Sequence, residues 1–405
     1  MKTHRSSRKR RLPYLLIAGL LVAYVVWAAL RPLPALLPKT AGGQLQLHTT
    51  GGQLAWPSGS QAAVGVAHTG ILETSGNQIP APTASTAKVI TVLTVLDKKP
   101  LQVGQDGPTI TLSDQDVALY NSYVAQDGSV VPVQAGEQLN ERQALEAIML
   151  PSANNMADSL AIWAFGSLDA YSKAATTYLQ QHGLRDTHVG SDASGLSPTT
   201  TSTAHDLVML GKLALDNPAL TAIAAQTTAS DIPVAGTVNN VNILLGSSGI
   251  IGIKTGNSDQ AGGVFLAAAK AAVNGKTPVV VTAVVGAPDL GSALRDSVAL
   301  VHSAQNNFQT VTAIRAGAIV GRYQQPWGGS LAATVAKDLN VTTWGGSDVT
   351  TNFTFRSVDN HIQAGQQVGT AQTAPSTFAD PVSVPVKLQA APTKPSIWWR
   401  LSHAY

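Results

Sequence analysis

A serine and a lysine stand three residues apart in the stretch APTASTAKVITVLTVL, which covers residues 81–96. On a helix, Ser85 and Lys88 would share one face, so the amine could reach the hydroxyl. Burial disfavours the ammonium form, so an apolar surround would lower the lysine pKa and let the neutral amine act as a base for the serine. The spacing also occurs by chance, and it equally fits Ser85 as a helix N-cap with Lys88 extending to solvent.

Two further short motifs narrow this choice. The motif S-A-N runs from Ser152 to Asn154 and falls in a predicted break between two helices, where a hydroxyl and an amide can project into a cleft. The motif K-T-G, residues 254–256, falls on a predicted strand, which would carry an ammonium, a hydroxyl and an edge without a side chain. Each motif is weak alone, but the three in this order and in these contexts are much more specific.

The elements that must hold these motifs follow from hydrophobic periodicity. Apolar residues on nearly every face predict that the helix over 85–99 is buried on all sides. The other predicted elements are two strands around a turn (62–75), two helical segments interrupted near Pro151 (140–166), a helix ended by Asn217–Pro218 (201–218), three adjacent antiparallel strands (248–288) and a helix (292–308).

This order of elements predicts an α+β fold, in which an antiparallel sheet carries packed helices. After about residue 308 the segments become short, alternating and β-branched, which predicts a small all-β domain. We therefore divide the chain into a basic tail (1–11), a transmembrane anchor (12–30), a linker (31–45), a main domain (46–308), the all-β domain (309–390) and a tail (391–405).

The charge pattern points to a membrane rather than to nucleic acid. Six of the 26 basic residues lie among the first eleven, and without them the chain has 20 basic and 23 acidic residues, a net charge of −3. The 19 residues from Leu12 to Leu30 carry no charge and nearly span a bilayer core of roughly 30 Å. Basic residues before such a span hold that end in the cytoplasm, so the rest would be extracytoplasmic. A cleaved signal peptide is the alternative interpretation.

In this order and setting, the three motifs resemble those of the serine D,D-carboxypeptidases, the low-molecular-mass group of the penicillin-binding proteins. The resemblance covers about residues 45–308 and extends to HTGILETSGNQIPAPTAS before the nucleophile and to ASGLSPTTTSTAHDLVMLGKLAL, which resembles the segment lining the far side of the cleft. It implies a β-lactamase/transpeptidase-like fold. The β domain, with IQAGQQVGTAQ, is similar to the C-terminal domain often appended to this group.

The resemblance implies that Ser85 attacks the carbonyl between two terminal D-alanines of a peptidoglycan stem peptide, that Lys88 takes its proton and that Ser152 relays a proton. β-Lactams would acylate the same serine. The implied substrate-binding residues are Asn154, Lys254, Thr255, Gly256 and Asn257. Among these, the first two residues of K-T-G would hold the terminal carboxylate, and the backbone N–H groups of residues 85 and 257 would form the oxyanion hole. Neither a cofactor nor a metal is expected, because the nine histidines are scattered.

Three other functions are compatible with parts of this sequence. A class A β-lactamase needs a glutamate well after its Ser-x-Asn element, but no glutamate follows Glu146. A D,D-endopeptidase or transpeptidase would use the same site with another bond or acceptor. A non-catalytic cell-wall-binding protein would be free to lose some of the motif residues, all of which are present. The sequence leaves open the stem peptide, hydrolysis versus transfer, the oligomeric state and the role of the β domain.

Overall fold

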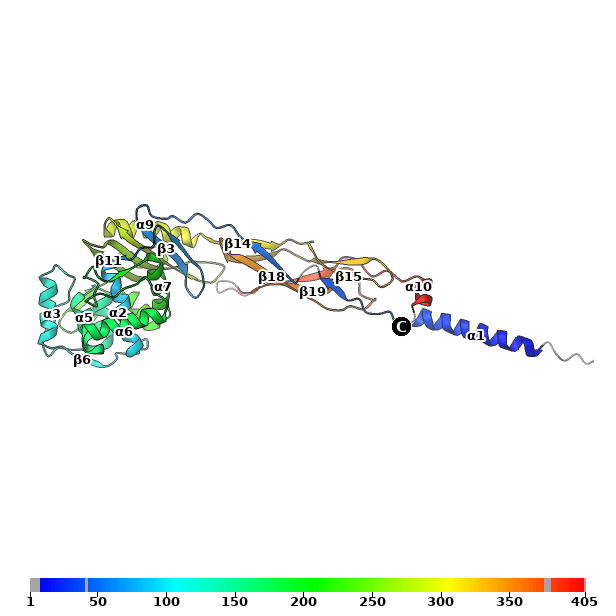
Figure 1. Cartoon of the computed structure of the whole chain (residues 1–405), viewed down its shortest axis with the longest axis horizontal. Helices are drawn as coiled ribbons and strands as arrows, with labels where there is room; N and C mark the ends of the chain where they lie inside the picture. Colours follow the sequence, from blue (N-terminus) through cyan, green and yellow to red (C-terminus); the bar gives the residue numbers. More distant parts are fainter. Residues whose placement is uncertain (1–7, 41–42, 375–379, 404–405) are drawn as a thin grey trace, which may run out of the picture. The chain divides into compact units, whose positions relative to one another are not determined.

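The computed structural model describes residues 8–40, 43–374 and 380–403, so the first seven residues of the predicted basic tail lie outside the described range. The chain divides into two compact units. One unit is Gly51–Gln309, and the other combines Met1–Thr50 with Thr310–Tyr405. Figure 1 shows the helices and strands of both.

A five-stranded antiparallel sheet in the order β11-β12-β13-β3-β4 forms the base of the Gly51–Gln309 unit. The strands are β3 (Gln61–Val66), β4 (Leu72–Ser75), β11 (Ile250–Ser258), β12 (Gly262–Lys270) and β13 (Val279–Ala287). The predicted strand pair around the turn at residues 68–70 and the three predicted neighbouring strands are both confirmed. Three short two-stranded ladders complete the unit: β5 (Ala81–Pro82) with β8 (Thr201–Ser202), β6 (Thr109–Thr111) with β7 (Gln138–Asn140), and β9 (Thr228–Ile232) with β10 (Gly236–Asn239).

Helices cover both faces of this sheet, which explains why β12 and β13 are apolar along most of their length. Leu266 and Val281 belong to the core formed with α2 and α7, whereas the alternate residues Phe265 and Val280 point to the face that α9 covers. Figure 1 shows α9 on the side of the sheet opposite α2 and α7. The helices are α2 (Ala87–Lys98), α3 (Asp114–Val124), α4 (Glu141–Met149), α5 (Asn154–Phe165), α6 (Leu168–Gln181), α7 (Ala204–Leu215), α8 (Pro218–Ala224) and α9 (Leu290–Gln305).

The central helix α2 is buried on all sides, as predicted. Every residue from Ala87 to Leu96 is buried, because α4, α5, α6 and α7 all contact this helix. The predicted interruption near Pro151 separates α4 from α5. The predicted stop at Asn217 ends α7 and also begins α8, since the Asn217 side chain accepts a hydrogen bond from Leu220 N. Three helices of this unit, α3, α6 and α8, were not predicted.

The second unit is an all-β module with its own apolar core. Its seven-stranded sheet has the order β1-β15-β16-β20-β19-β18-β2, and β14 pairs separately with β17. The strands are β1 (Pro38–Thr40), β2 (Gln44–His48), β14 (Phe308–Ile314), β15 (Ile319–Gln324), β16 (Ser330–Val335), β17 (Leu339–Trp344), β18 (Asp348–Phe355), β19 (Gln367–Thr373) and β20 (Ser383–Leu388). The predicted fold class, helices on an antiparallel sheet followed by a small all-β domain, is confirmed.

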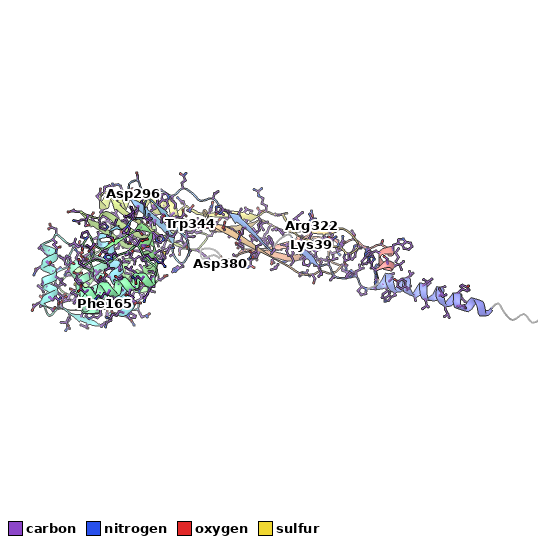
Figure 2. The ribbon with its side chains drawn as sticks, in the orientation of Figure 1. Lys39, Phe165, Asp296, Arg322, Trp344 and Asp380 are labelled. Atoms are coloured by element: carbon purple, nitrogen blue, oxygen red, sulfur yellow. The ribbon has the colours of Figure 1, made fainter. Side chains whose placement is uncertain are left out.

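The segment predicted as a linker, residues 31–45, differs from that prediction. β1 pairs with β15, and β2 pairs with β18, so both outer strands of the module's sheet come from residues 38–48. Lys39 and Arg322 face each other across the first of these pairs (Figure 2). Pairing satisfies the backbone groups that would otherwise be left on the edges of β15 and β18. The Pro and Gly content of this segment predicted a stalk. Local composition does not show that residues 38–48 pair with strands far along the chain.

The N-terminal helix α1 (Arg8–Leu30) contains Pro13–Leu30, an apolar window with the length and composition of a membrane span. Most of its described side chains are exposed to solvent, unlike those of a core helix. The helix is therefore a candidate membrane anchor. At the other end of the chain, the predicted tail contains a short helix, α10 (Ile397–Ser402).

Candidate active site

Ser85 and Lys88 lie where a short 3-10 turn, η1 (Ala84–Thr86), leads directly into α2. Lys88 Nζ is 2.8 Å from Ser85 Oγ, so the amine does reach the hydroxyl. Lys88 is completely buried and does not extend to solvent. The interpretation of the pair as an N-cap beside a solvent-seeking lysine is therefore wrong.

The other partners of Lys88 determine what its amine can do. Nζ lies 2.6 Å from Asn154 Oδ1 and 3.0 Å from the carbonyl oxygen of Ser194. Both oxygens can only accept hydrogen bonds, and a neutral amine has two N–H donors and one lone pair. When the two donors go to these two oxygens, the lone pair is left for Ser85. The neutral amine is therefore held ready to accept the hydroxyl proton.

Burial and a second lysine favour this neutral form. Burial lowers the pKa of Lys88 well below its ordinary value, the nearby charge of Lys254 lowers it further, and Asp192 and Asp158 partly oppose this shift. Burial also lowers the pKa of Lys254, to about 7. Because the charge on Lys254 disfavours a second charge on Lys88, this pair of amines favours a neutral Lys88 whenever Lys254 is charged.

The K-T-G motif lies on β11, the edge strand of the sheet, and touches the backbone of the serine turn. A Cβ at Gly256 would lie only 2.8 Å from Thr83 O and 3.2 Å from Ser85 N, so only glycine allows this approach. Lys254 and Thr255 are buried, and Lys254 Nζ donates a hydrogen bond to Thr255 O at 3.2 Å. The motif thus brings the backbone after Gly256 next to the backbone of Ser85.

Ser152 occupies the connection between α4 and α5 with a left-handed backbone, φ 66°, and Ala84 in the serine turn is left-handed too, with φ 44°. Such conformations cost roughly 1–3 kcal/mol for residues other than glycine and concentrate at functional sites. Ser152 is buried. Across the described residues, no direct hydrogen bond joins its side chain to Lys88 or Lys254, so its relay role stays a prediction. Asn154, predicted to bind substrate, accepts a hydrogen bond from Lys88 through Oδ1, and its contact with substrate stays a prediction.

Sequence reasoning missed a carboxylate next to this cluster. Asp158 lies one helical turn after Asn154 on α5, and its two oxygens accept hydrogen bonds from Tyr123 Oη at 2.6 Å and from Ala193 N at 2.8 Å. Burial raises the pKa of Asp158 to about 6, and the hydrogen bond from Tyr123 counteracts part of this rise. The signal in the sequence was an acidic residue four positions after Asn154, on the same helix face.

A turn built on Asp192 supplies the carbonyl that accepts from Lys88. The Asp192 carboxylate accepts hydrogen bonds from the backbone N–H groups of Ser194 at 3.0 Å, Gly195 at 2.6 Å and Ser197 at 2.6 Å. Gly195 is left-handed, and a Cβ there would lie 2.2 Å from Ala84 O. The turn is therefore fixed against the serine turn, which places the Ser194 carbonyl beside the lysine.

A cleft of about 820 Å³ starts beside these groups. Asn257 and Ser258, which directly follow K-T-G, line it on one side, and Asp192 and Leu196 line it on another. This agrees with the prediction that the segment containing Leu196 borders the cleft. The cleft is open to solvent, and its lining includes residues 257–260, which directly follow Gly256.

No group of three or more histidine, cysteine or acidic side chains able to hold a metal occurs within the described ranges. The chemistry available at the site is that of the buried amines, the hydroxyls and the backbone amides. Such a set can activate a serine, bind an anionic group and stabilise an oxyanion.

The sequence model of the D-alanyl-D-alanine carboxypeptidase family matches residues 49–288, more than half of the chain. The chain belongs to this family. The D-alanyl-D-alanine carboxypeptidase DacB2 of Mycobacterium tuberculosis is 32% identical over 197 residues, which are 46% of this chain. The D-alanyl-D-alanine carboxypeptidase DacA of Escherichia coli is 27% identical over 258 residues, which are 61% of this chain. The matches span 62% of each relative's own length.

Solved structures share the fold of this D-alanyl-D-alanine carboxypeptidase family member. Penicillin binding protein 5 from Haemophilus influenzae matches with a TM-score of 0.57 at 20% identity, covering 84% of this chain and 98% of that one. The Streptomyces K15 DD-transpeptidase matches with a TM-score of 0.54 at 23% identity, covering 63% and 98%. At these identities the likeness establishes the fold, and it confirms the predicted penicillin-binding-protein architecture.

Proposed function

We propose that this chain is a serine D,D-carboxypeptidase that removes the terminal D-alanine from peptidoglycan stem peptides. One observation carries the proposal: the buried Lys88 amine contacts Ser85 Oγ while its two remaining contacts are oxygens that can only accept. When neutral and donating to those two oxygens, the Lys88 amine has its lone pair left for the serine. The chain also belongs to the D-alanyl-D-alanine carboxypeptidase family, so the expected target of this serine is a peptide that ends in D-alanyl-D-alanine.

In the proposed acylation step, Ser85 Oγ bonds to the carbonyl carbon of the penultimate D-alanine and its proton passes to Lys88 Nζ. The negative charge that develops on the carbonyl oxygen is stabilised by the backbone N–H groups of Ser85 and Asn257. The close contact at Gly256 supports this pairing, because it brings those two backbone segments together. The C–N bond then breaks, the leaving amine takes a proton through Ser152, and D-alanine departs. Water hydrolyses the ester and restores Ser85.

Substrate selection follows from the charges. A terminal carboxylate would be held by Lys254 and Thr255 on β11, and it would raise the lowered pKa of Lys254 by supplying an opposite charge. Asn154 would contact the substrate backbone, and Gly256 would let that backbone approach β11. β-Lactams carry a carboxylate beside a reactive carbonyl, so they would acylate Ser85. A transpeptidase or endopeptidase would use the same residues, and the acceptor or bond used distinguishes these activities.

The deciding experiment exposes the full chain in detergent to a labelled penicillin and maps the adduct by mass spectrometry. We expect one adduct on the peptide that contains Ser85, and none in Ser85→Ala. The control is Ser330→Ala, which removes an exposed serine of the β module. D-alanine release from a stem pentapeptide, measured alone and with an acceptor amine, then separates hydrolysis from transfer. An adduct on another residue, or labelling of Ser85→Ala, would contradict the proposal.

We also propose that α1 anchors the protein in the membrane as a single span, with the Gly51–Gln309 unit on the extracytoplasmic side. The apolar window of α1 and the basic residues that precede it support this orientation. Resistance to alkaline carbonate extraction tests the anchor, and protease accessibility in spheroplasts tests the side. The mass of the membrane-bound protein shows whether the span is retained, because cleavage as a signal peptide would remove it.

A further inference from the structure

The end of the chain folds back onto the end of α1. Arg400 of α10 donates hydrogen bonds from Nη1 to the carbonyl oxygens of Ala28 at 3.2 Å, Ala29 at 2.9 Å and Arg31 at 3.1 Å. The last carbonyls of a helix lack partners within the helix and carry partial negative charge. A guanidinium is therefore well suited to this position, and here it comes from a residue about 370 positions away in the sequence.

Further contacts run in both directions between the two segments. Arg31 Nη2 donates to Arg400 O at 2.8 Å, and Tyr24 Oη donates to Leu401 O at 2.6 Å. The Arg31 guanidinium also lies over the Trp27 ring, 5.4 Å from its centroid. Figure 1 shows α10 beside the end of α1. Each of the two arginines thus donates a hydrogen bond to the backbone carbonyl of the other, and several hydrogen bonds hold α10 against α1.

The two tryptophans of α10 have opposite surroundings. Trp399 packs edge-on against Trp327 of the β module, with ring centroids 5.5 Å apart. Its neighbour Trp398 is 77% exposed, and Ile397 beside it is 46% exposed. Leu30, the last residue of α1, is 78% exposed. An exposed indole and two exposed aliphatic side chains therefore lie at the point where an apolar helix emerges.

We propose that α10 is a membrane-interface latch, in which Trp398 and Ile397 insert into the headgroup region of the phospholipid bilayer that α1 crosses and Arg400 fixes α10 to α1. The latch rests on the proposed membrane anchoring of α1. A bilayer is the occupant favoured for this exposed surface because it continues the exposed apolar surface of α1, which must itself lie in lipid. Tryptophan is enriched at the level of the headgroups, where its ring is apolar and its N–H group can be hydrated.

The latch would attach the β module to the membrane surface at a second point. α1 alone would attach the module through one chain segment, but α10 adds a second attachment from the other end of the module's sequence. Trp399 joins this attachment to the module through Trp327, whose Nε1 donates to Thr393 Oγ1 at 3.2 Å. The latch is separate from the serine site, so catalysis on a soluble peptide does not depend on it.

Fluorescence quenching in vesicles tests the latch. The full chain is reconstituted in phosphatidylcholine–phosphatidylglycerol vesicles containing lipids brominated either near the headgroup or deep in the acyl chain. The signal of Trp398 is the difference between wild type and Trp398→Phe, and Trp344→Phe is the control, since Trp344 is fully buried in the module. We expect the shallow bromine to reduce the Trp398 fluorescence to about half or less, and the deep bromine to reduce it by a smaller amount. The Trp344 fluorescence should not change with either lipid.

The outcomes separate the latch from the anchor. Resistance to carbonate extraction with a Trp398 signal that no bromolipid quenches would leave the anchor standing and overturn the latch. If acrylamide in water also failed to quench that signal, the surface would be covered by protein, such as a second copy, which overturns the latch as well. Extraction by carbonate would overturn both proposals.

A second variant tests the role of Arg400 without changing a tryptophan. In Arg400→Gln the bonds to the α1 carbonyls are lost, so we expect Trp398 to be quenched less by the shallow bromolipid and more by acrylamide. The matched control is Arg356→Gln, which removes an exposed arginine of the same module that bonds the Gln367 carbonyl. D-alanine release from a soluble pentapeptide should stay at the wild-type rate in both variants. Unchanged Trp398 quenching in Arg400→Gln would contradict the fixing role of Arg400.

Discussion

The two units of the chain differ in what they bury. All buried charged side chains within the described residues belong to the Gly51–Gln309 unit, whereas the buried polar side chains of the β module are uncharged threonines and one glutamine. The buried charged residues are Lys88, Glu137, Glu141, Glu146, Asp158, Asp206 and Lys254. Removing a charge from water is costly. Among the described residues the β module avoids this cost, while the Gly51–Gln309 unit bears it seven times.

The buried charges of that unit are themselves of two kinds. Glu146 pairs with Arg142 at 2.7 Å, and Asp206 accepts hydrogen bonds from Asp186 N and Thr187, so both are compensated. Lys88 and Lys254 contact only neutral oxygens among the described residues, and each keeps a lowered pKa. Buried amines without an ion-pair partner are typical of sites that need a base or bind an anion. Glu146 and Asp206 are therefore buried as parts of the structure, whereas the burial of Lys88 and Lys254 is explained by the chemistry of the site.

The sharpest test of this comparison is Lys88→Met, which keeps the length and apolar stem of the side chain but removes the base. We expect acylation by penicillin to slow by about 10²–10⁴-fold, the usual contribution of a general base. The measurement is the rate of labelled-penicillin incorporation by stopped-flow or gel assay. Lys212→Met is the matched control, because Lys212 is a partly buried lysine that also donates to two carbonyls, far in the chain from Ser85. Rapid labelling of Lys88→Met would refute the base assignment.

The pH dependence of kcat/KM for a free-acid peptide should be bell-shaped. Lys88 must be neutral, so the rate rises as pH increases through its lowered pKa, and Lys254 must be charged to bind a carboxylate, so the rate falls as pH rises above about 7. Lys254→Met should abolish the falling limb and reduce the preference for free-acid over amidated peptides by about 10–100-fold, the usual strength of a hydrogen bond to a charge. An unchanged alkaline limb in this variant would assign it to another group.

Asp158→Asn should give a smaller effect, because the Asp158 carboxylate accepts from Tyr123 and Ala193 and has no hydrogen bond to Ser85 or Lys88 among the described residues. We expect acylation to slow by about tenfold, equivalent to about 1.4 kcal/mol. The exposed Asp169→Asn on α6 is the control. The raised pKa, about 6 against an ordinary 3.8, makes wild-type stability fall as pH rises through that window, because the folded state binds more protons there. Denaturant titrations should show this slope in wild type and lose it in Asp158→Asn; the same slope in both would contradict the burial of a titrating carboxyl.

Leu388→Ala should have the smallest effect on catalysis. Leu388 is buried in the core of the β module, and its truncation should lower that module's free energy of unfolding by about 2–5 kcal/mol. Because the two units have separate cores, we expect the acylation rate to stay at the wild-type value. Calorimetry and penicillin labelling on the same sample measure both quantities. A parallel loss of acylation would show that the serine site depends on the β module.

Local patterns account for the parts of this molecule that were predicted. The helix over 85–99 has apolar residues on every face, so it has to be buried on all sides. The strands β3, β4 and β11–β13 were predicted from strand-forming segments bounded by turn residues. The β module's strands were recognised as a class, but their order was not, and the pairing of β1 and β2 with β15 and β18 joins residues about 300 positions apart. Helix α3, which supplies Tyr123, has a weak apolar pattern and was missed.

The sequence by itself determined the three motifs, the family resemblance, the buried character of α2 and the apolar span. Only the tertiary structure decided that the Lys88 amine meets Asn154, 66 residues away, and the Ser194 carbonyl, 106 residues away, and that Asp158 binds Ala193 N beside that carbonyl. The physical reason is that hydrogen bonds and desolvation depend on distance and burial in space. A sequence specifies which groups exist, but the direction of a lone pair and the pKa of a buried amine are fixed only when distant segments pack around them.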